Sequence, residues 1–310
     1  MTIPKLSPYV LPNAEELPQS RAPWQPDPAR AVLLIHDMQR YFMGFFEPAV
    51  SPICEVVASI QTLKAACVSA TVPIVYSAQP VDQAPEDRGL LTDMWGPGLP
   101  AHPDQADIVA ELSPGAGDAV LRKTRYSAFH GTELLALMRA EGRDQLWICG
   151  VYGHIGCMLT AFDAFMNDVQ PFLIADAIAD FTRCHHSMAL ELVASRCGVV
   201  LHAQTLLARM ATHRSSDVRA RVLREVGELV GHAPGQLDLR EDLLGLGLDS
   251  VRRMELTDRL QADGIEVSPL DVMECDSLEA LCALVAGATI ADVTDEPAVL
   301  RSCAAKTGAP

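Results

Sequence analysis

One run of the chain places a reactive hydroxyl at the start of a helix. Residues 246–250 read LGLDS, and apolar residues follow near helical spacing at Val251, Met254, Leu256 and Leu260. Ser250 therefore begins a helix, where its hydroxyl is exposed and the helix dipole favours an added phosphate. A serine before an apolar run is also a common helix N-cap. The run predicts a phosphate attachment point or, in the plainer interpretation, only a cap.

Four polar residues follow apolar runs at the places where strands should end. They are Asp37, Gln79, Lys123 and Tyr152. Ligands of parallel sheets bind at the carboxyl ends of the strands, so these four are the first candidates for a site. An Asp after a strand can also do no more than cap the next turn, and Lys123 could be a surface lysine.

The elements that must position these residues lie between 31 and 203. Apolar runs predict six strands, at 31–36, 72–77, 119–122, 145–151, 171–176 and 198–202. Amphipathic segments predict helices at about 52–70, 131–142, 155–168 and 185–197. Such alternation is typical of a parallel sheet covered on both faces. We expect an α/β fold, a six-stranded, mainly parallel sheet flanked by helices in three Rossmann-like layers.

A second, smaller domain should follow, because the alternation stops in LARMATHRSS (207–216). Helical patterns then occur at 218–230, 250–262, 269–273 and 277–285, with a long loop at 231–249. They predict a small C-terminal four-helix bundle. The expected division is a first domain over 1–207, a linker over 208–216, the bundle over 217–290 and a mobile tail over 291–310.

The charge is concentrated in that smaller domain. The net charge is −16, and residues 215–290 hold 15 Asp or Glu against 7 Arg and no Lys, a net of −8. Such acidity argues against nucleic acid and suits docking on basic partner surfaces. Nine cysteines, an odd number without C-x-x-C spacing, argue against a disulfide framework or a metal site.

Nothing in the sequence predicts export or membrane insertion. The first 25 residues are rich in Pro and lack a long apolar run. No stretch reaches the ~18 apolar residues that a membrane span needs. We expect a cytoplasmic protein with reduced thiols.

Several longer motifs resemble the isochorismatases. They are IPKLSPYVLP near the start, LLIHDMQRYF, SAQP, EDRGLLTDMWGPGL, KTRYSAFHGT and GVYGHIGCMLTAFDAFMNDVQPFLIADAIADF. With the LGLDS domain behind them, residues 1–290 resemble the bifunctional isochorismatase and aryl carrier proteins of catecholate siderophore synthesis. The resemblance implies hydrolysis of the enolpyruvyl ether of isochorismate, giving 2,3-dihydro-2,3-dihydroxybenzoate and pyruvate. A vinyl ether is hydrolysed by protonating its terminal carbon, which needs an acid but neither a metal nor a nucleophile.

The resemblance also implies roles for single residues. Asp37 matches the family's general acid, and Lys123 matches its active-site lysine. Related cysteine hydrolases place a Cys nucleophile at the helix after the fourth strand. Here Gly156 stands at that position and Cys157 comes one residue late, which turns its side chain by about 100°. The backbone N–H of Gly156 could bind a substrate oxygen.

The remaining pocket residues are implied in the same way. Gln79, Arg88 and Tyr152 should hold the substrate, and Phe42 and Trp95 should be apolar walls, although pattern alone would put both aromatics in the core. Arg88 suits a carboxylate because its fork binds one bidentately. Thr124 stands where the family usually has Trp, which puts fine substrate preference in doubt. We expect no metal, because the histidines lack zinc-helix spacing: His36, His154, His185 and His186.

For the second domain, the resemblance implies a 4′-phosphopantetheine arm on Ser250. Asp249 would help the phosphopantetheinyl transferase and its Mg²⁺ to engage the serine. The other partners would be an aryl acid adenylating ligase and the condensation domain of a nonribosomal peptide synthetase. Some apolar residues could dock these partners, although at least half of them should fill the bundle core: Leu248, Val251, Met254 and Met273. A homo-oligomer is also expected.

Three alternatives stay open on the sequence. The chain could be an aminodeoxyisochorismate hydrolase fused to a carrier, which shares Asp, Lys and Gly at these positions. It could be a carrier with a catalytically silent isochorismatase scaffold. A cysteine amidohydrolase is disfavoured by Gly156.

Overall fold

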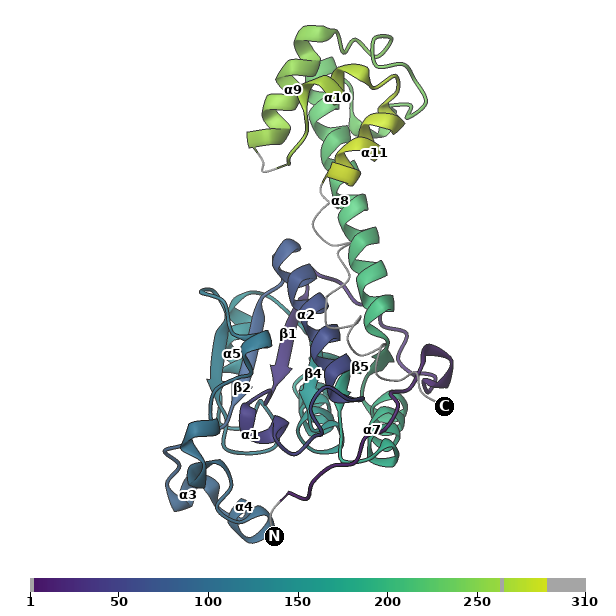
Figure 1. Cartoon of the computed structure of the whole chain (residues 1–310). Coiled ribbons are helices and arrows are strands. Elements are labelled where there is room, and N and C mark those ends of the chain that lie inside the picture. The colour runs from purple at the N-terminus through teal and green to yellow at the C-terminus, as the bar shows by residue number, and fades with distance from the viewer. Residues whose placement is uncertain (1–2, 263–264, 289–310) are drawn as a thin grey trace. The chain divides into compact units, whose positions relative to one another are not determined.

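The first part of the chain is built on one parallel sheet. The computed structural model describes residues 3–262 and 265–288. Its strands are β1 (Ala31–His36), β2 (Ile74–Ala78), β3 (Ala119–Arg122), β4 (Gln145–Val151), β5 (Gln170–Ala179) and β6 (Val199–Leu201). Their order is β3-β2-β1-β4-β5-β6, and every neighbouring pair is parallel. The predicted six-stranded α/β sheet is confirmed (Figure 1).

Helices cover both faces of this sheet. The covering helices are α2 (Ile53–Ser69), α5 (Leu134–Ala140), α6 (Met158–Met166), α7 (Arg183–Arg196) and the first turns of α8 (Ala203–Val230). The short helices α1 (Arg40–Met43), α3 (Pro85–Arg88) and α4 (Leu91–Trp95) follow the ends of β1 and β2. Buried side chains of α2 and α8 share one core cluster, and those of α5, α6 and α7 share the other. The result is the three-layer arrangement that the alternating pattern predicts.

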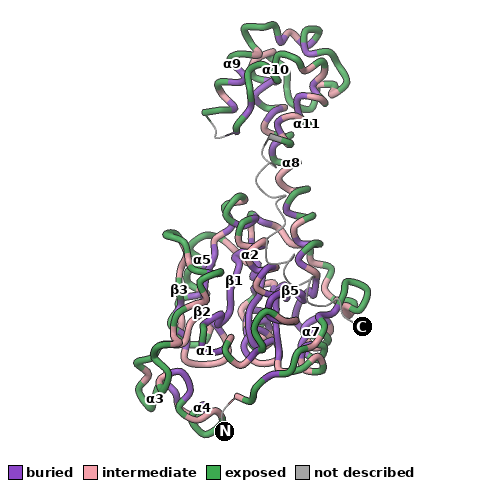
Figure 2. Tube along the Cα trace, in the orientation of Figure 1, coloured by how far each residue is buried: buried purple, intermediate pink, exposed green. Residues whose placement is uncertain are grey.

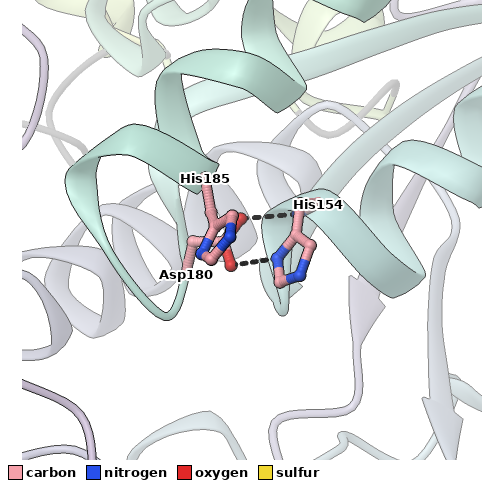
Figure 3. A group of neighbouring side chains, drawn as sticks. All are labelled: His154, Asp180 and His185. Carbon is pink, nitrogen blue, oxygen red and sulfur yellow. Dashed lines mark hydrogen bonds and ion pairs between the residues drawn. The ribbon is translucent and has the colours of Figure 1, made fainter.

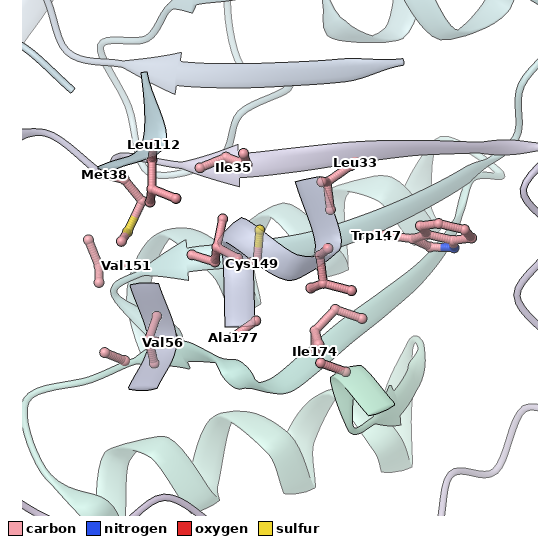
Figure 4. Close-up of a cluster of buried hydrophobic side chains, with 14 of the residues drawn as sticks. Leu33, Ile35, Met38, Val56, Leu112, Trp147, Cys149, Val151, Ile174 and Ala177 are labelled. Atoms are coloured by element: carbon pink, nitrogen blue, oxygen red, sulfur yellow. The ribbon is translucent and has the colours of Figure 1, made fainter. Parts of the chain in front are cut away.

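Side chains alternate along β1 between the two cores. Leu33 and Ile35 join the cluster beneath α2, where Figure 4 shows them with Val56 and Trp147. The alternate residues Val32 and Leu34 join the opposite cluster. All six residues of β1 are buried, and the central strands are purple in Figure 2. Burial on both faces explains why β1 reads AVLLIH, a continuous apolar run.

Several predicted elements differ from the structure in their bounds. Strand β5 extends to Ala179, three residues past its predicted end. The expectation that a helix starts at Val218 is wrong, because α8 begins at Ala203 and residues 208–216 are helical. That stretch contains neither Gly nor Pro, so nothing in it interrupts the backbone hydrogen bonds. The chain separates into two compact units between Met210 and Ala211.

The second unit is a small helical bundle, as predicted. The rest of α8 is joined by α9 (Ser250–Ala262), α10 (Pro269–Glu274) and α11 (Leu278–Ala288). Its core includes Val222, Val226, Leu256, Leu260 and Leu281. The predicted tail at 291–310 lies outside the described residues. Within the described ranges, no helix is long and apolar enough to cross a membrane.

Candidate active site

The predicted site residues of the first unit meet at the carboxyl edge of the sheet. Asp37, Gln79, Lys123 and Tyr152 each follow a strand, β1 to β4 in turn. These strand ends lie side by side, because the strands are parallel and adjacent. All four residues line one pocket. The other predicted members line the same pocket: Phe42, Arg88, Trp95 and Gly156.

A buried ion pair lies in this pocket. Lys123 Nζ is 2.7 Å from Asp37 Oδ2, and both residues are at most 5% exposed. Ser77 Oγ donates to Asp37 Oδ1 over 2.7 Å, and Lys123 Nζ also donates to the Arg125 carbonyl over 2.8 Å. The carboxyl group is therefore fixed from both sides. A positioned carboxyl and amine in direct contact can pass a proton, which is what general acid catalysis requires.

The backbone of Asp37 is itself unusual. Its φ is +50°, in the left-handed region that non-glycine residues rarely adopt, although Asp tolerates it better than most. The Asp37 N–H donates to the Ser77 carbonyl over 3.1 Å, which secures the turn to the end of β2. Strained residues of this kind cluster at functional sites, so the turn supports Asp37 as a site residue.

Gly156 and Cys157 lie on different sides of one turn. Residues 153–157 form a single π-helical turn ahead of α6. Gly156 lines the pocket, whereas Cys157 is fully buried in the cluster beneath α5, α6 and α7. Burial raises the pKa of the Cys157 thiol well above its ordinary value. A protonated thiol in the core cannot act as a nucleophile toward a ligand in the pocket.

Arg88 brings a second cation to the pocket wall. Its Nε donates to the Gly96 carbonyl over 2.8 Å. A Cβ at Gly98 would lie 2.3 Å from Arg88 Nη2, so the glycine leaves room for the guanidinium. Burial lowers the pKa of Arg88, but a guanidinium keeps its charge in proteins. Its terminal nitrogens suit a ligand carboxylate.

Aromatic rings enclose the rest of the pocket. Trp95 Nε1 donates to Tyr126 Oη over 2.8 Å, and the Tyr152 hydroxyl donates to the Phe42 carbonyl over 2.8 Å. The Tyr152 ring meets Phe181 edge-on at 4.8 Å between centroids. Burial raises the pKa of Tyr152 well above its ordinary value, so its hydroxyl stays protonated. These rings form an apolar enclosure, and Lys123 and Arg88 bring two cations to it.

Sequence reasoning missed several residues of this pocket. Tyr126 and Phe181 line it, and Ser77 and Gln39 support it from behind. The side chain of Gln39 bonds the backbone N–H and carbonyl of Gln79, over 2.7 and 2.9 Å. Tyr126 and Phe181 lie within motifs that resemble the isochorismatases, at KTRYSAF and IADF, and this resemblance is the sequence signal that could identify them as pocket residues. Thr124 is half-buried and does not line the pocket.

Two histidines and an aspartate beside the pocket have side chains of the types that bind metals, but they are arranged as a hydrogen-bonded structural cluster. Ligand atoms of His154, Asp180 and His185 lie within 4.8 Å of one another (Figure 3). The two rings stack at 4.4 Å and 14°, so their nitrogen lone pairs do not converge on one point. Asp180 already accepts from the His154 and Phe181 backbone N–H groups, and it also bonds His154 Nδ1.

In the second unit, Asp249 and not Ser250 caps helix α9. Asp249 Oδ1 accepts the Arg252 N–H over 2.9 Å. Ser250 is exposed, and within the described part of the chain its hydroxyl makes no hydrogen bond. The plain N-cap interpretation of Ser250 therefore loses its support. Its Oγ is free and stands at the positive end of the helix dipole.

Apolar side chains are exposed on the same helix and on α10. Val251 is 74% exposed, Met254 60% and Met273 37%, whereas Leu248 is fully buried in the bundle core. The expectation that at least half of these four fill the core is wrong, because only Leu248 points inward. Leu244 and Leu270 are exposed as well. We refer to Leu244, Val251, Met254, Leu270 and Met273 as the apolar patch.

Comparison with known proteins assigns both units. An isochorismatase domain model matches residues 31–205, and a phosphopantetheine attachment site model matches residues 220–285. The chain is 44% identical to an isochorismatase of Bacillus subtilis, over 90% of this chain and 94% of that protein. It is 45% identical to enterobactin synthase component B of Escherichia coli, over 84% and 89%. A cysteine hydrolase structure from Pseudomonas syringae shares the fold, with a TM-score of 0.57 and 23% identity over 63% of this chain and 98% of that one.

Proposed function

The chain belongs to the isochorismatase family and carries a phosphopantetheine attachment domain, and from this premise we propose that it hydrolyses isochorismate and carries an aryl acid. The observation that carries the first activity is the Asp37–Lys123 pair, which faces a pocket where Gly156 replaces a nucleophile. That arrangement suits protonation of a vinyl ether and does not suit amide hydrolysis.

Lys123 Nζ, 2.7 Å from the Asp37 carboxylate, passes a proton of its ammonium group to Asp37, and Asp37 delivers that proton to the terminal vinyl carbon, so the pair works as one donor. The resulting oxocarbenium ion takes up water at the ether carbon and releases one proton to the pair. The hemiketal then collapses to the ring alcohol and pyruvate, and no side chain becomes covalently attached.

The pocket matches the charge and shape of this substrate. Isochorismate carries two carboxylates, and Lys123 and Arg88 bring two cations to the pocket. Arg88 holds one carboxylate with its terminal nitrogens, and the Gly156 N–H binds a substrate oxygen. Gln79 offers a side-chain amide, and the ring of Trp95 packs against the planar diene.

The direct test is Asp37→Asn. The amide keeps the size of the side chain but cannot donate an acidic proton, so pyruvate release should fall by about 10²–10⁴-fold. Lactate dehydrogenase reports the pyruvate, and circular dichroism checks the fold. Asp82→Asn is the control, because Asp82 is an exposed carboxylate paired with Arg122. Near-normal release by Asp37→Asn would remove the assignment.

The second activity rests on Ser250, which fits the attachment of 4′-phosphopantetheine. A transferase esterifies its free hydroxyl, and Asp249 is next to it to meet the transferase's Mg²⁺. The arm, when attached, supplies a thiol that holds the aryl acid as a thioester. The apolar patch docks the transferase, the adenylating ligase and the condensation domain in turn, and the acidic surface orients basic partners.

The proposal includes a homo-oligomer of the hydrolase unit. What supports it is an exposed, mainly apolar groove beside the pocket, lined in part by Leu90, Met94, Leu159 and Met166. Exposed apolar surfaces of this kind commonly mark protein interfaces. Sedimentation equilibrium of the full chain tests it, and a single monomer mass at micromolar concentration would contradict it.

A further inference from the structure

Position 156 has no room for a side chain because a histidine ring occupies that space. A Cβ built on Gly156 would lie 2.1 Å from His36 Cε1, 2.8 Å from Nε2 and 2.9 Å from Nδ1. Real Cβ atoms do not approach other atoms so closely. The imidazole of His36 therefore fills the volume in which any side chain at position 156 would begin.

The ring of His36 is held where it is. It is completely buried, and its Nδ1 lies 2.9 Å from the Val151 carbonyl oxygen. Its Nε2 lies 3.2 Å from the Tyr126 carbonyl oxygen. Burial lowers the pKa of His36, and a neutral ring donates to one of these carbonyls at a time. No exposed or flexible end of the side chain can give way to a larger residue at 156.

These contacts join three segments that bear pocket residues. His36 immediately precedes Asp37, Val151 precedes Tyr152, and Tyr126 itself lines the pocket. The ring thus connects the ends of β1 and β4 with the segment that follows β3. A change in the ring would shift the carboxyl group of Asp37 relative to the pocket walls.

We propose that His36 is a positioning residue that fills the side-chain space of position 156 and fixes Asp37 against the walls of the pocket. The proposal rests on the proposed hydrolysis of isochorismate. The chemical reason for filling the space at position 156 is that the oxocarbenium ion is a strong electrophile. A thiol or hydroxyl at position 156 would bond to that carbon and trap it, whereas a space filled by His36 leaves water as the nucleophile.

The test is a double-mutant cycle with His36→Ala, Gly156→Ala and the double variant, all in the full chain. Gly156→Ala should lower kcat/KM by at least about tenfold and the melting temperature by about 5 °C. In the His36→Ala background the same added methyl should lower kcat/KM by less than about twofold and the melting temperature by about 1 °C or less. Gly117→Ala is the control for the backbone effect, since nothing lies within 4 Å of its added methyl.

If Gly156→Ala causes equal losses in the native and the His36→Ala backgrounds, the proposal that His36 and a side chain at position 156 compete for one space is overturned. If Gly156→Ala does not fold, the double variant should still give soluble protein, and failure of both would also overturn the proposal.

The positioning role of His36 has a separate test. His36→Ala should lower kcat about tenfold with KM within about threefold, and His36→Asn should recover part of kcat because its amide can still reach the Val151 carbonyl. An unchanged kcat in His36→Ala would contradict that role. If the native protein releases no pyruvate, the proposed function fails, but the melting temperatures still decide whether His36 and a side chain at position 156 compete for one space.

Discussion

At the scale of residues, one step along the chain separates a pocket position from a core position. Gly156 faces the ligand space, and Cys157 is packed among apolar side chains on the other side of the turn. The free thiols of this chain therefore differ greatly in reactivity. Burial raises the pKa of Cys157 and removes its thiolate, whereas Cys184 is exposed.

Cys157→Ala should accordingly leave turnover within about twofold of normal while lowering the free energy of unfolding by about 1 kcal/mol, since a buried group is lost. Iodoacetamide should label Cys184 quickly and Cys157 only after unfolding. Peptide mass spectrometry measures both rates. A covalent adduct of isochorismate on Cys157 would contradict the account and restore a nucleophilic mechanism.

At the scale of elements, the N-terminal segment is tied to α7 and β5 through His186. The Asp180 N–H donates to Tyr9 Oη, and the Tyr9 hydroxyl donates to His186 Nδ1 over 3.0 Å. His186 Nε2 donates to the Ala175 carbonyl over 3.0 Å. Every donor in this series of hydrogen bonds has an acceptor only when the His186 imidazole is neutral. Burial lowers the pKa of His186 to about 4.

The unfolded chain, with an ordinary histidine pKa near 6.5, binds this proton more readily than the native state does. Stability from His186 is therefore complete above about pH 6.5 and is lost as the pH falls toward 4, by about 3 kcal/mol at most. When the pH falls from 7.5 to 5, the free energy of unfolding of His186→Gln should fall by about 2 kcal/mol less than that of the native chain. The variant keeps a pH dependence in the same direction, because His36 is also buried and burial lowers its pKa.

Urea unfolding followed by tryptophan fluorescence measures this difference. The chain's three tryptophans, Trp24, Trp95 and Trp147, all belong to the first unit, so the signal reports on the unit that contains His186. His130→Gln is the control at an exposed histidine and should keep the full pH dependence. Identical slopes for His186→Gln and the native chain would be the contrary result.

How each element is packed decides how well it could be predicted from the sequence. Five of the six strands are almost wholly buried, so their apolar runs are continuous and their ends could be located, whereas the edge strand β3 is partly exposed. The strand ends placed Asp37, Gln79, Lys123 and Tyr152. Helix α8 was misjudged at 208–216, because only its two ends pack on apolar cores and the middle shows no periodic pattern. His36 and Ser77 could not be assigned, since their roles depend on contacts between strands that the linear pattern does not contain.

At the scale of the whole molecule, the chain joins a hydrolase to a carrier with different surface chemistry. Residues 215–290 hold half of the net charge, and the exposed apolar patch comes from α9, α10 and the loop before Ser250. A carrier must be recognised by several enzymes in succession, which an acidic surface with a small apolar contact area serves well.

Ser250→Ala should abolish arm attachment while isochorismate hydrolysis stays normal, because no step of vinyl ether hydrolysis uses the serine. Intact-protein mass spectrometry after incubation with coenzyme A and a broad-specificity transferase measures the gain of one phosphopantetheine. Ser268→Ala, which removes the cap of α10, is the matched control and should still be modified. A gain that survives in Ser250→Ala would place the arm elsewhere.

The central claim is that the enolpyruvyl ether is cleaved after protonation of its vinyl carbon, with water attacking the pyruvate side. Hydrolysis of isochorismate in H₂¹⁸O tests this most directly, with mass spectrometry of the ring product. The account predicts one pyruvate per ring product and a dihydroxy ring acid without ¹⁸O, because the ether oxygen stays on the ring. Incorporation of ¹⁸O into the ring acid, or no pyruvate at all, would contradict it.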